Sequence, residues 1–190
     1  MNHWVEGKSV ALVGNAMSLF ELNYGSEIDS HDVVVRLNKA AILLNRFDAE
    51  QSHGKRTDIW VFWSVREYYK HFDKHKDILK VHAGHQNRDS NLIKMVDFVY
   101  PMELYEPLKE KAGARKNPTT GFIAIDYILH CKPSMLSVYG FDWKKTPTQT
   151  DPDRKKEARC PHNYDVEEAY CMGHVFTRHN VFLKNDSQVT

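Results

Sequence analysis

The sequence predicts an α/β fold, in which a mainly parallel central sheet is flanked by helices. Short apolar runs alternate with longer amphipathic stretches through most of the chain, which is the pattern of strands connected by crossover helices. The length of 190 residues and the apolar share of 42% suit one hydrophobic core. We therefore expect a single domain over residues 1–190.

The individual elements follow from local patterns. The expected strands are short apolar runs, and they span Ser9–Val13, Val33–Leu37, Ile59–Trp63, Leu79–Ala83, Phe98–Tyr100 and Met135–Tyr139. The expected helices have apolar residues at helical spacing, and they span Met17–Leu22, Val65–Asp77, Ser90–Met95, Pro101–Ala112 and Gly121–Cys131. Arg46–Arg56 is polar and is expected to be a loop. Residues 144–161 form a longer polar loop with prolines, which is either a lid over a ligand or a plain surface excursion.

The composition excludes several classes of protein. The 26 basic residues balance 25 acidic ones, so the basic excess of a nucleic-acid-binding protein is missing. No apolar run approaches the ~20 residues of a membrane span, and the N-terminus lacks the basic and apolar regions of a signal peptide. The three cysteines fit free thiols in a reducing compartment. We expect a cytoplasmic protein with no membrane span and no nucleic-acid partner.

Two of the expected strands end in asparagine. The run Val10–Val13 continues directly into Gly14 and Asn15, and the second strand is followed by Asn38. The carboxyl ends of parallel strands share one edge of the sheet, so the two amides are expected to line a crevice suited to a nucleotide. Asparagine both donates and accepts hydrogen bonds without adding charge. The Gly-Asn pair is also common in plain turns, so this motif alone leaves both interpretations open.

A third candidate feature is the segment Pro118–Gly121, which leads into an apolar helix. Thr119 or Thr120 is a natural N-cap, and Gly121 would let a ligand approach the backbone closely. A helix start offers unpaired N–H groups and a positive dipole end, which together can bind a phosphate. The same residues also fit a capped core helix without any ligand.

The segment His162–Glu167 is the candidate for proton transfer. A histidine with a near-neutral pKa is a natural general base for a hydroxyl, and a carboxylate nearby can orient the ring. Glu167 lies five residues after His162, which is not a same-face helical spacing. A competing hypothesis is a tetrahedral zinc set, which would occupy the base and would consist of Cys160, His162, Cys171 and His174.

In this order, the segments resemble the sialyltransferases of glycosyltransferase family 29. Val10–Lys39 is similar to the large sialylmotif, Pro118–Phe141 to the small motif, and His162–Glu167 to the very small motif. The resemblance implies a single Rossmann-like domain, a sialyltransferase-like variant of the GT-A fold. It also implies metal-independent, inverting transfer of sialic acid or a related nonulosonic sugar from a CMP-activated donor to an acceptor hydroxyl, with no cofactor besides this donor.

The resemblance also assigns residues and partners. It makes His162 the general base and places Glu167 with it among the catalytic residues. The residues that it assigns to the nucleotide come from the large and small motifs, and they are Gly14, Asn15, Ser18, Asn38, Thr119, Thr120, Gly121, Gly140, Phe141 and Asp142. The implied partners are a nucleotide-sugar donor and a glycan acceptor. A homo-oligomer stays open, since a short chain leaves little material for an acceptor cleft.

The chain departs from the family pattern in three ways. The expected N-terminal membrane anchor and stem are missing and the chain is short. Val10 stands where the animal enzymes have a cysteine, so Cys131 cannot form their disulfide bond, in keeping with a cytoplasmic protein. The separate second histidine motif is missing, because no histidine lies between His130 and His162.

Three alternatives therefore stay open. If His162 serves the phosphate, the base would be His174 or His179. The chain could instead be a degenerate CMP-binding module without catalysis, or a zinc-stabilised interaction domain.

Overall fold

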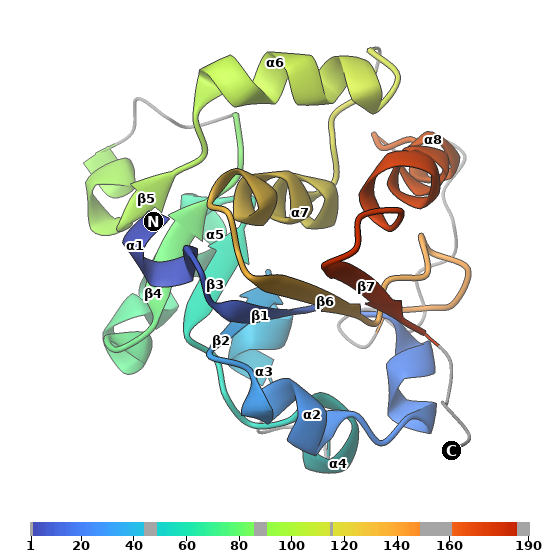
Figure 1. The fold of residues 1–190 in the computed structure, drawn as a ribbon. Helices are drawn as coiled ribbons and strands as arrows, with labels where there is room; N and C mark the ends of the chain where they lie inside the picture. The colour runs from blue at the N-terminus through green and yellow to red at the C-terminus, as the bar shows by residue number, and fades with distance from the viewer. Residues whose placement is uncertain (1, 44–48, 86–90, 115, 149–160, 186–190) are drawn as a thin grey trace.

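The computed structural model describes residues 2–43, 49–85, 91–114, 116–148 and 161–185 (Figure 1). Its centre is a seven-stranded sheet with the strand order β5-β4-β3-β2-β1-β6-β7, and the neighbouring strands pair in parallel. The strands are β1 (Ser9–Val13), β2 (Val33–Leu37), β3 (Ile59–Phe62), β4 (Leu79–His82), β5 (Phe98–Val99), β6 (Met135–Tyr139) and β7 (Val181–Lys184). The prediction of an α/β fold with a mainly parallel sheet is confirmed.

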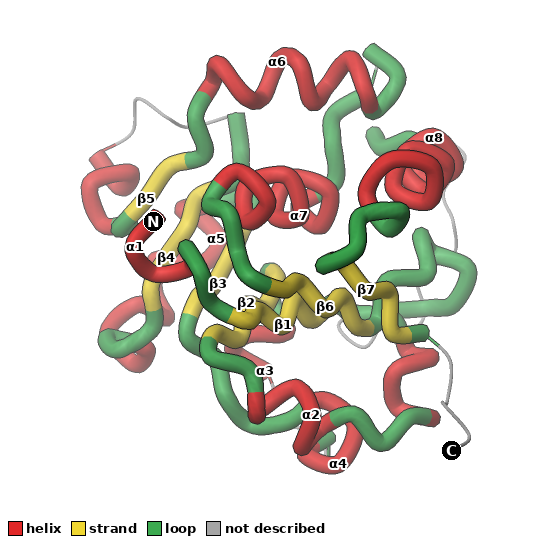
Figure 2. Tube along the Cα trace, viewed as in Figure 1, coloured by secondary structure: helices red, strands yellow, loops and turns green. Residues whose placement is uncertain are grey.

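Helices cover both faces of this sheet. Figure 1 shows α6, α7 and α8 on one side and α2, α3 and α4 on the other, and Figure 2 shows the strands lying between these layers. The helices are α1 (Asn2–Val5), α2 (Gly25–Ser30), α3 (Ala40–Leu43), α4 (Glu50–His53), α5 (Val65–Tyr68), α6 (Met102–Lys111), α7 (Thr120–His130) and α8 (Tyr164–Tyr170). The tighter 3₁₀ segments are η1 (Met17–Glu21), η3 (Tyr69–His75) and η4 (Asn91–Met95), and η5 (Cys171–Val175) is a π-helical turn.

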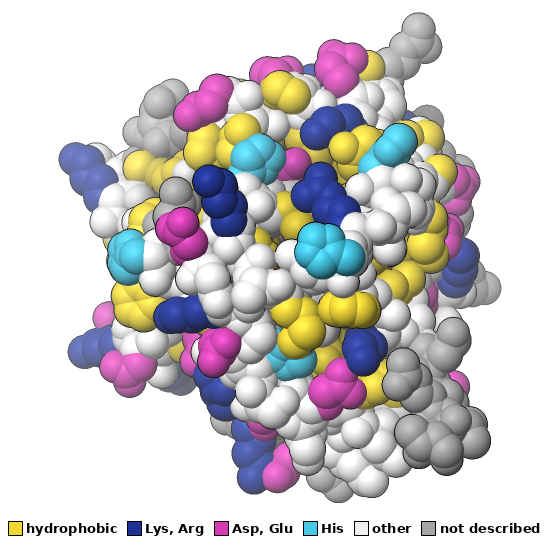
Figure 3. Space-filling model, in the orientation of Figure 1, with side chains coloured by type: hydrophobic (Ala, Val, Ile, Leu, Met, Phe, Trp, Pro, Cys, Tyr) yellow, Lys and Arg dark blue, Asp and Glu magenta, His cyan; other side chains and the backbone are white. Residues whose placement is uncertain are grey.

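The central strands are buried on both faces, which explains their continuous apolar runs. Along β1, Val10 and Leu12 belong to the core cluster that includes α7, whereas Ala11 and Val13 pack with η1 and α2. All five residues of β2 are buried. One of them is Arg36, whose guanidinium donates to the carbonyl oxygens of His53 and Arg56 at 2.6 and 2.8 Å. The face of the molecule that Figure 3 shows mixes both signs of charge, in keeping with the balanced composition.

Several parts of the fold differ from the sequence prediction. The segment 46–56 was expected to be a loop, but residues 50–53 form the one-turn helix α4, and the carbonyl oxygen of His53 in this helix accepts a hydrogen bond from Arg36. Helices α1, α2, α3 and α8 and strand β7 are additions that the sequence prediction did not include. Most of the expected lid, residues 149–160, lies outside the described residues. Among the described residues, no helix is both long and apolar enough to cross a bilayer.

The strand order places the site. Strand β1 lies between β2 and β6, so the connections run in opposite directions on its two sides. Such a switch point leaves a crevice outside the carboxyl ends of the strands, where ligands bind in open α/β sheets.

Candidate functional site

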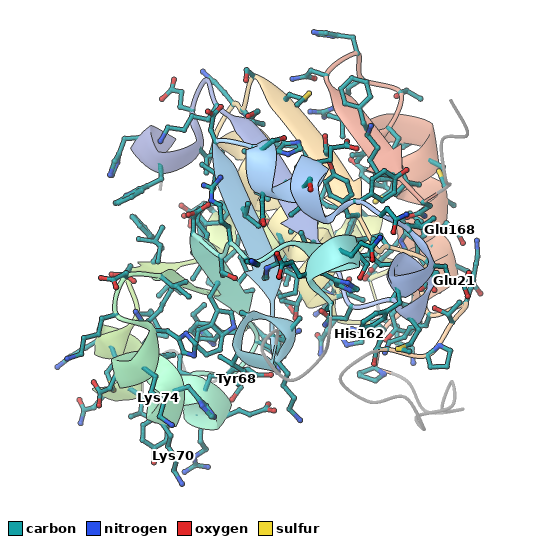
Figure 4. The ribbon with its side chains drawn as sticks, turned by 90° about the horizontal axis from the view of Figure 1, so that it is seen from below. Glu21, Tyr68, Lys70, Lys74, His162 and Glu168 are labelled. Carbon is teal, nitrogen blue, oxygen red and sulfur yellow. The ribbon has the colours of Figure 1, made fainter. Side chains whose placement is uncertain are left out.

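A pocket of about 560 Å³ opens at the carboxyl ends of β1, β2 and β6, a size typical of small-ligand sites. It brings together most of the residues predicted from the sequence, namely Gly14, Asn15, Asn38, Thr119, Thr120, Gly121, Gly140, Phe141, Asp142, His162 and Glu167. Ser18 is not among the lining residues, because it lies further along in η1. Figure 4, seen from below, labels His162 and Tyr68, which both line the pocket.

The two asparagines present complementary groups to the pocket. Asn38 has a φ of 48°, a left-handed conformation that asparagine tolerates better than most residues. Its Oδ1 accepts a hydrogen bond from the backbone N–H of Trp63 at 3.1 Å, so the side-chain NH₂ is the part that can serve a ligand. The Oδ1 of Asn15 is buried and has no hydrogen-bond partner among the described residues. Because buried polar atoms are normally paired, a ligand that donates to Asn15 and accepts from Asn38 fits this edge.

The glycines of the two motifs accommodate a single aromatic ring. A Cβ atom on Gly14 would lie 2.4 Å from the carbonyl oxygen of Gly140 and 2.7 Å from the Phe141 ring. A Cβ atom on Gly121 would lie 2.6 Å from the same ring. Gly121 was predicted to admit a ligand, but its neighbour in the structure is Phe141. The ring therefore ties the end of β1 to the beginning of α7, and this fixes the floor of the pocket.

The carboxylate of Glu167, a residue of α8, binds the beginning of α7. Thr119 is the N-cap of this helix, and its Oγ1 accepts from the N–H of Phe122 at 3.0 Å. Thr119 also donates to both carboxylate oxygens of Glu167, from its N–H at 2.8 Å and from its hydroxyl at 2.6 Å. Two donors that the sequence assigned to a phosphate are thus used by the protein itself. These contacts make Glu167 a positioning residue that joins α8 to α7, and its predicted role beside His162 stays a prediction.

The buried position changes the acidity of Glu167. The residue is only 1% exposed, and burial raises its pKa from the usual 4.5 to about 7, although the hydrogen bonds from Thr119 oppose the rise. A carboxylate without solvent favours its neutral form. Glu167 therefore changes its charge near neutral pH, at the contact that holds the helix start.

His162 lies with one ring nitrogen anchored. Its Nδ1 is 2.8 Å from the backbone carbonyl oxygen of Asn117. A carbonyl oxygen only accepts, so Nδ1 carries the hydrogen and Nε2 carries the lone pair in the neutral ring. The backbone N–H of Asn117 donates to the carbonyl of Pro161 at 3.1 Å, which ties the two segments together in both directions. This is the tautomer that a general base needs at Nε2.

Further lining residues were missed in the sequence. They come from helix α5 and from the loops after β2, β3 and β6, and they include Lys39, Trp63, Glu67, Tyr68, Lys144 and Thr148. Lys39 and Glu67 form an ion pair at 3.5 Å. Trp63 directly follows β3, and the rule that ligands lie at the carboxyl ends of strands could have indicated it. Lys144 had no such signal, since it stands in a polar loop without periodicity.

The zinc hypothesis finds no support in the part of the chain that the structure describes. No group of three or more His, Cys, Asp or Glu side chains could hold a metal ion there. Cys171 is buried and lines the pocket, and His174 packs its ring against Tyr170 at 4.9 Å. Cys160, the fourth member of the predicted set, lies outside the described residues.

Comparison with known proteins gives one family. The model of glycosyltransferase family 29 (sialyltransferase) matches residues 5–105, more than half of the 190 residues. No curated protein matches the chain.

Solved structures share the fold. A mammalian sialyltransferase in complex with Gal-β-1-3GalNAc-ortho-nitrophenol is 17% identical, with a TM-score of 0.68 over 97% of this chain and 71% of that chain. The monofunctional α-2,3-sialyltransferase Cst-I from Campylobacter jejuni is 15% identical, with a TM-score of 0.63 over 96% and 78%. The sialyltransferase CstII from the same organism, in complex with the substrate analogue CMP-3FNeuAc, is 16% identical, with a TM-score of 0.58 over 93% and 80%.

Proposed function

The chain belongs to glycosyltransferase family 29, the sialyltransferases, and we propose that His162 is the general base of its transfer reaction. The reaction moves sialic acid or a related nonulosonic sugar from a CMP-activated donor to an acceptor hydroxyl. We propose further that the transfer inverts the sugar's anomeric configuration and needs no metal ion.

Nucleotide binding is assigned to the strand tips. The unpaired Oδ1 of Asn15 accepts from a donor of the nucleotide, and the side-chain NH₂ of Asn38 donates to one of its oxygen or nitrogen atoms. Cytidine carries both kinds of group on its base and ribose. The prediction of Gly14, Gly140 and Phe141 as nucleotide residues is supported through the pocket floor that they form.

The chemical step follows from the position of His162. The acceptor oxygen attacks the anomeric carbon and loses its proton to Nε2, while the bond between that carbon and the phosphate oxygen breaks and CMP departs. A single displacement of this kind inverts the anomeric configuration. The observation that carries the proposal is the hydrogen bond from Nδ1 to Asn117, because it places the lone pair of the neutral ring on Nε2 of a pocket-lining histidine.

Metal independence rests on the leaving group. CMP departs as a phosphate monoester, whose charge can be met by preorganised N–H dipoles and cationic side chains. The residues for proton transfer are present in the chain itself, so no metal-bound water is required by the step above.

The direct test is incubation of the purified protein with CMP-sialic acid and a panel of galactoside acceptors, with and without EDTA. We expect free CMP and a sialylated product in equal amounts, unchanged by EDTA. Binding of CMP without donor cleavage would select the degenerate module instead, and loss of transfer in EDTA would contradict metal independence.

We also propose a reducing, cytoplasmic setting for the enzyme. Cys131 and Cys171 are both free and buried, and burial raises the pKa of the Cys171 thiol to about 12. Buried thiols of this kind fit a compartment in which disulfide bonds are not formed.

A further inference from the structure

We propose that Lys144 is a catalytic residue whose ammonium group stabilises the phosphate of CMP as the donor bond breaks. The inference rests on the proposed function, because it concerns the leaving group of that reaction. It assigns to one side chain the phosphate-binding role that the sequence placed at the start of α7.

The first step is that two of the donors expected to bind the phosphate, both from Thr119, are occupied within the protein. Thr119 donates both its N–H and its hydroxyl to Glu167, so the carboxylate of the protein takes up this part of the α7 start. Strand β1 is followed by the five-residue 3₁₀ segment η1 in place of the α-helix whose N-terminus binds the phosphates in dinucleotide-binding folds. The two donors of Thr119 are therefore not available to a departing phosphate, and a cationic side chain at the pocket would supply positive charge in their place.

The second step is the position of Lys144. It lines the pocket together with Thr148 and Ala16, and its Nζ lies 3.5 Å from the Oγ1 of Thr148. Thr148 pairs with Ala16 in an antiparallel bridge, and the N–H of Met17 donates to the carbonyl of Pro147 at 3.0 Å. These contacts hold the loop after β6 against the loop after β1. The ammonium group thus stands at the switch point of the sheet, where the phosphate of a nucleotide is expected.

The third step is the strained backbone that presents the side chain. Trp143 and Lys144 have φ values of 50° and 65°, although residues with a Cβ atom rarely adopt the left-handed region. Asp142 holds this turn, because its carboxylate accepts from the N–H of Lys144 at 3.0 Å and from the N–H of Thr146 at 2.9 Å. Strain of this kind persists where the surroundings impose it, and it clusters at ligand sites. Asp142 is consequently a positioning residue for Lys144.

The fourth step is the charge of the other lining residues. Lys39, which follows Asn38 at the end of β2, also lines the pocket and is paired with Glu67 at 3.5 Å. Lys145 does not line the pocket and pairs instead with Glu168, which Figure 4 labels. Among the described lining residues, Lys144 is the lysine beside the loop after β1, as its contact with Thr148 shows, and its neighbour Lys145 is a matched control.

The proposed step is electrostatic. The bond from the anomeric carbon to the phosphate oxygen breaks, and its electron pair remains on that oxygen. Lys144 stays protonated and faces the added negative charge, while the acceptor proton goes to His162. A preorganised cation of this kind favours the transition state over the ground state, since the phosphate charge grows as the bond breaks.

The test is calorimetric titration with CMP and with cytidine, which differ only in the phosphate. We expect the wild type to bind CMP more tightly than cytidine. In Lys144→Gln, CMP affinity should fall about tenfold to a hundredfold, as for loss of a charge-assisted hydrogen bond, while cytidine affinity stays within about twofold. Lys144→Arg should restore most of the CMP affinity, and Lys145→Gln should match the wild type. Turnover of CMP-sialic acid in Lys144→Gln should fall at least as much as CMP affinity.

Unchanged cytidine binding in Lys144→Gln also shows that the pocket is folded. A Lys144→Gln protein that keeps the wild-type preference for CMP over cytidine overturns the proposal, as does loss of this preference in Lys39→Gln alone. If the wild type binds neither cytidine nor CMP, the proposed function itself fails, and this result differs from the failure of Lys144 alone.

Discussion

The two sides of the pocket are held in different ways. On the strand side, Asn15 and Asn38 directly follow β1 and β2, which pair with each other in the centre of the sheet. On the C-terminal side, His162 and Glu167 are held by hydrogen bonds to Asn117 and Thr119, which lie far away in the sequence. In the proposed assignment, nucleotide recognition is therefore built into the sheet, whereas proton transfer depends on docking of the α8 segment against the start of α7.

This difference predicts separable effects. Changes at the strand tips should affect ligand affinity, and changes in the floor beneath them should affect folding. Changes on the C-terminal side should affect turnover or its pH dependence while the sheet remains folded. The predictions below test this separation, beginning with the largest expected effect.

Replacement of the base should give the largest change in turnover. His162→Ala should reduce the rate of transfer by about 10²–10⁴-fold, as expected for loss of general base catalysis, and leave CMP affinity within about tenfold. Steady-state kinetics and calorimetric titration measure the two quantities. His174→Ala is the matched control and should retain activity. Retained activity in His162→Ala, with loss in His174→Ala, would transfer the role of base to His174.

Two glycines that both pack against the Phe141 ring should differ in how much stability is lost when each is replaced by alanine. Gly14→Ala meets the backbone oxygen of Gly140 and should destabilise the protein by about 3 kcal/mol, at the upper end for overpacking. Gly121→Ala meets only side-chain atoms among its closest neighbours, chiefly the Phe141 ring, and should cost about 1–2 kcal/mol. Urea unfolding measures both.

A second-site change sharpens this contrast. In a Phe141→Leu background, the cost of Gly121→Ala should fall, because the ring that it meets is gone, while much of the cost of Gly14→Ala should remain. Equal relief of both substitutions would show that the Gly140 carbonyl is not the barrier at Gly14.

Glu167 should give the protein a specific dependence of stability on pH. Its folded pKa of about 7 lies above the usual 4.5, so its contribution to stability is complete below pH 4.5 and is lost as the pH rises through about 7. The free energy of unfolding of the wild type, relative to Glu167→Gln, should therefore fall by about 3 kcal/mol between pH 4.5 and 8.

Urea unfolding of both proteins across this range provides the measurement. Burial lowers the pKa of His53 to about 4, which destabilises the fold as the pH falls. That effect is common to both proteins and cancels in the difference. A difference that is independent of pH would show that Glu167 titrates normally.

Substitution of Asn38 should give the smallest of these effects, and Asn38→Asp should affect CMP binding without affecting folding. Asn38→Ala removes the acceptor for the Trp63 N–H and should weaken both folding and CMP binding, the latter on the order of 1–3 kcal/mol. Asn38→Asp keeps an acceptor and a residue suited to positive φ, but it loses the NH₂ donor. We expect CMP affinity to fall about tenfold in Asn38→Asp with little change in urea unfolding. Wild-type CMP affinity in this variant would contradict the assignment of Asn38 as a donor to the nucleotide.

The sequence predicted the strand side well because its signals are local. The apolar runs of β1 and β2 mark strands that are buried on both faces, and an asparagine directly after such a strand must lie at the ligand edge of a parallel sheet. The N-cap at Thr119 is likewise a local pattern. Short-range periodicity could not predict α4, because this single turn is stabilised by a hydrogen bond from the buried guanidinium of Arg36, in β2, to the carbonyl oxygen of His53.

The C-terminal side was only partly predictable, because its geometry depends on contacts that are distant in sequence. The motif identified His162 and Glu167 and placed both among the catalytic residues, but it could not show that the carboxylate of Glu167 binds Thr119. The sequence could not show why position 121 is a glycine, because the reason is the close approach of the Phe141 ring. No sequence pattern indicated Lys144 as a site residue, because its position depends on a left-handed turn that the carboxylate of Asp142 stabilises.

The central claim is that the strand-tip pocket is a site for cytidine monophosphate. Calorimetric titration of the wild type with CMP, UDP and NAD tests it most directly. The account predicts saturable one-to-one binding of CMP that is clearly tighter than that of UDP or NAD. Absence of CMP binding, or equal affinity for all three nucleotides, would contradict it.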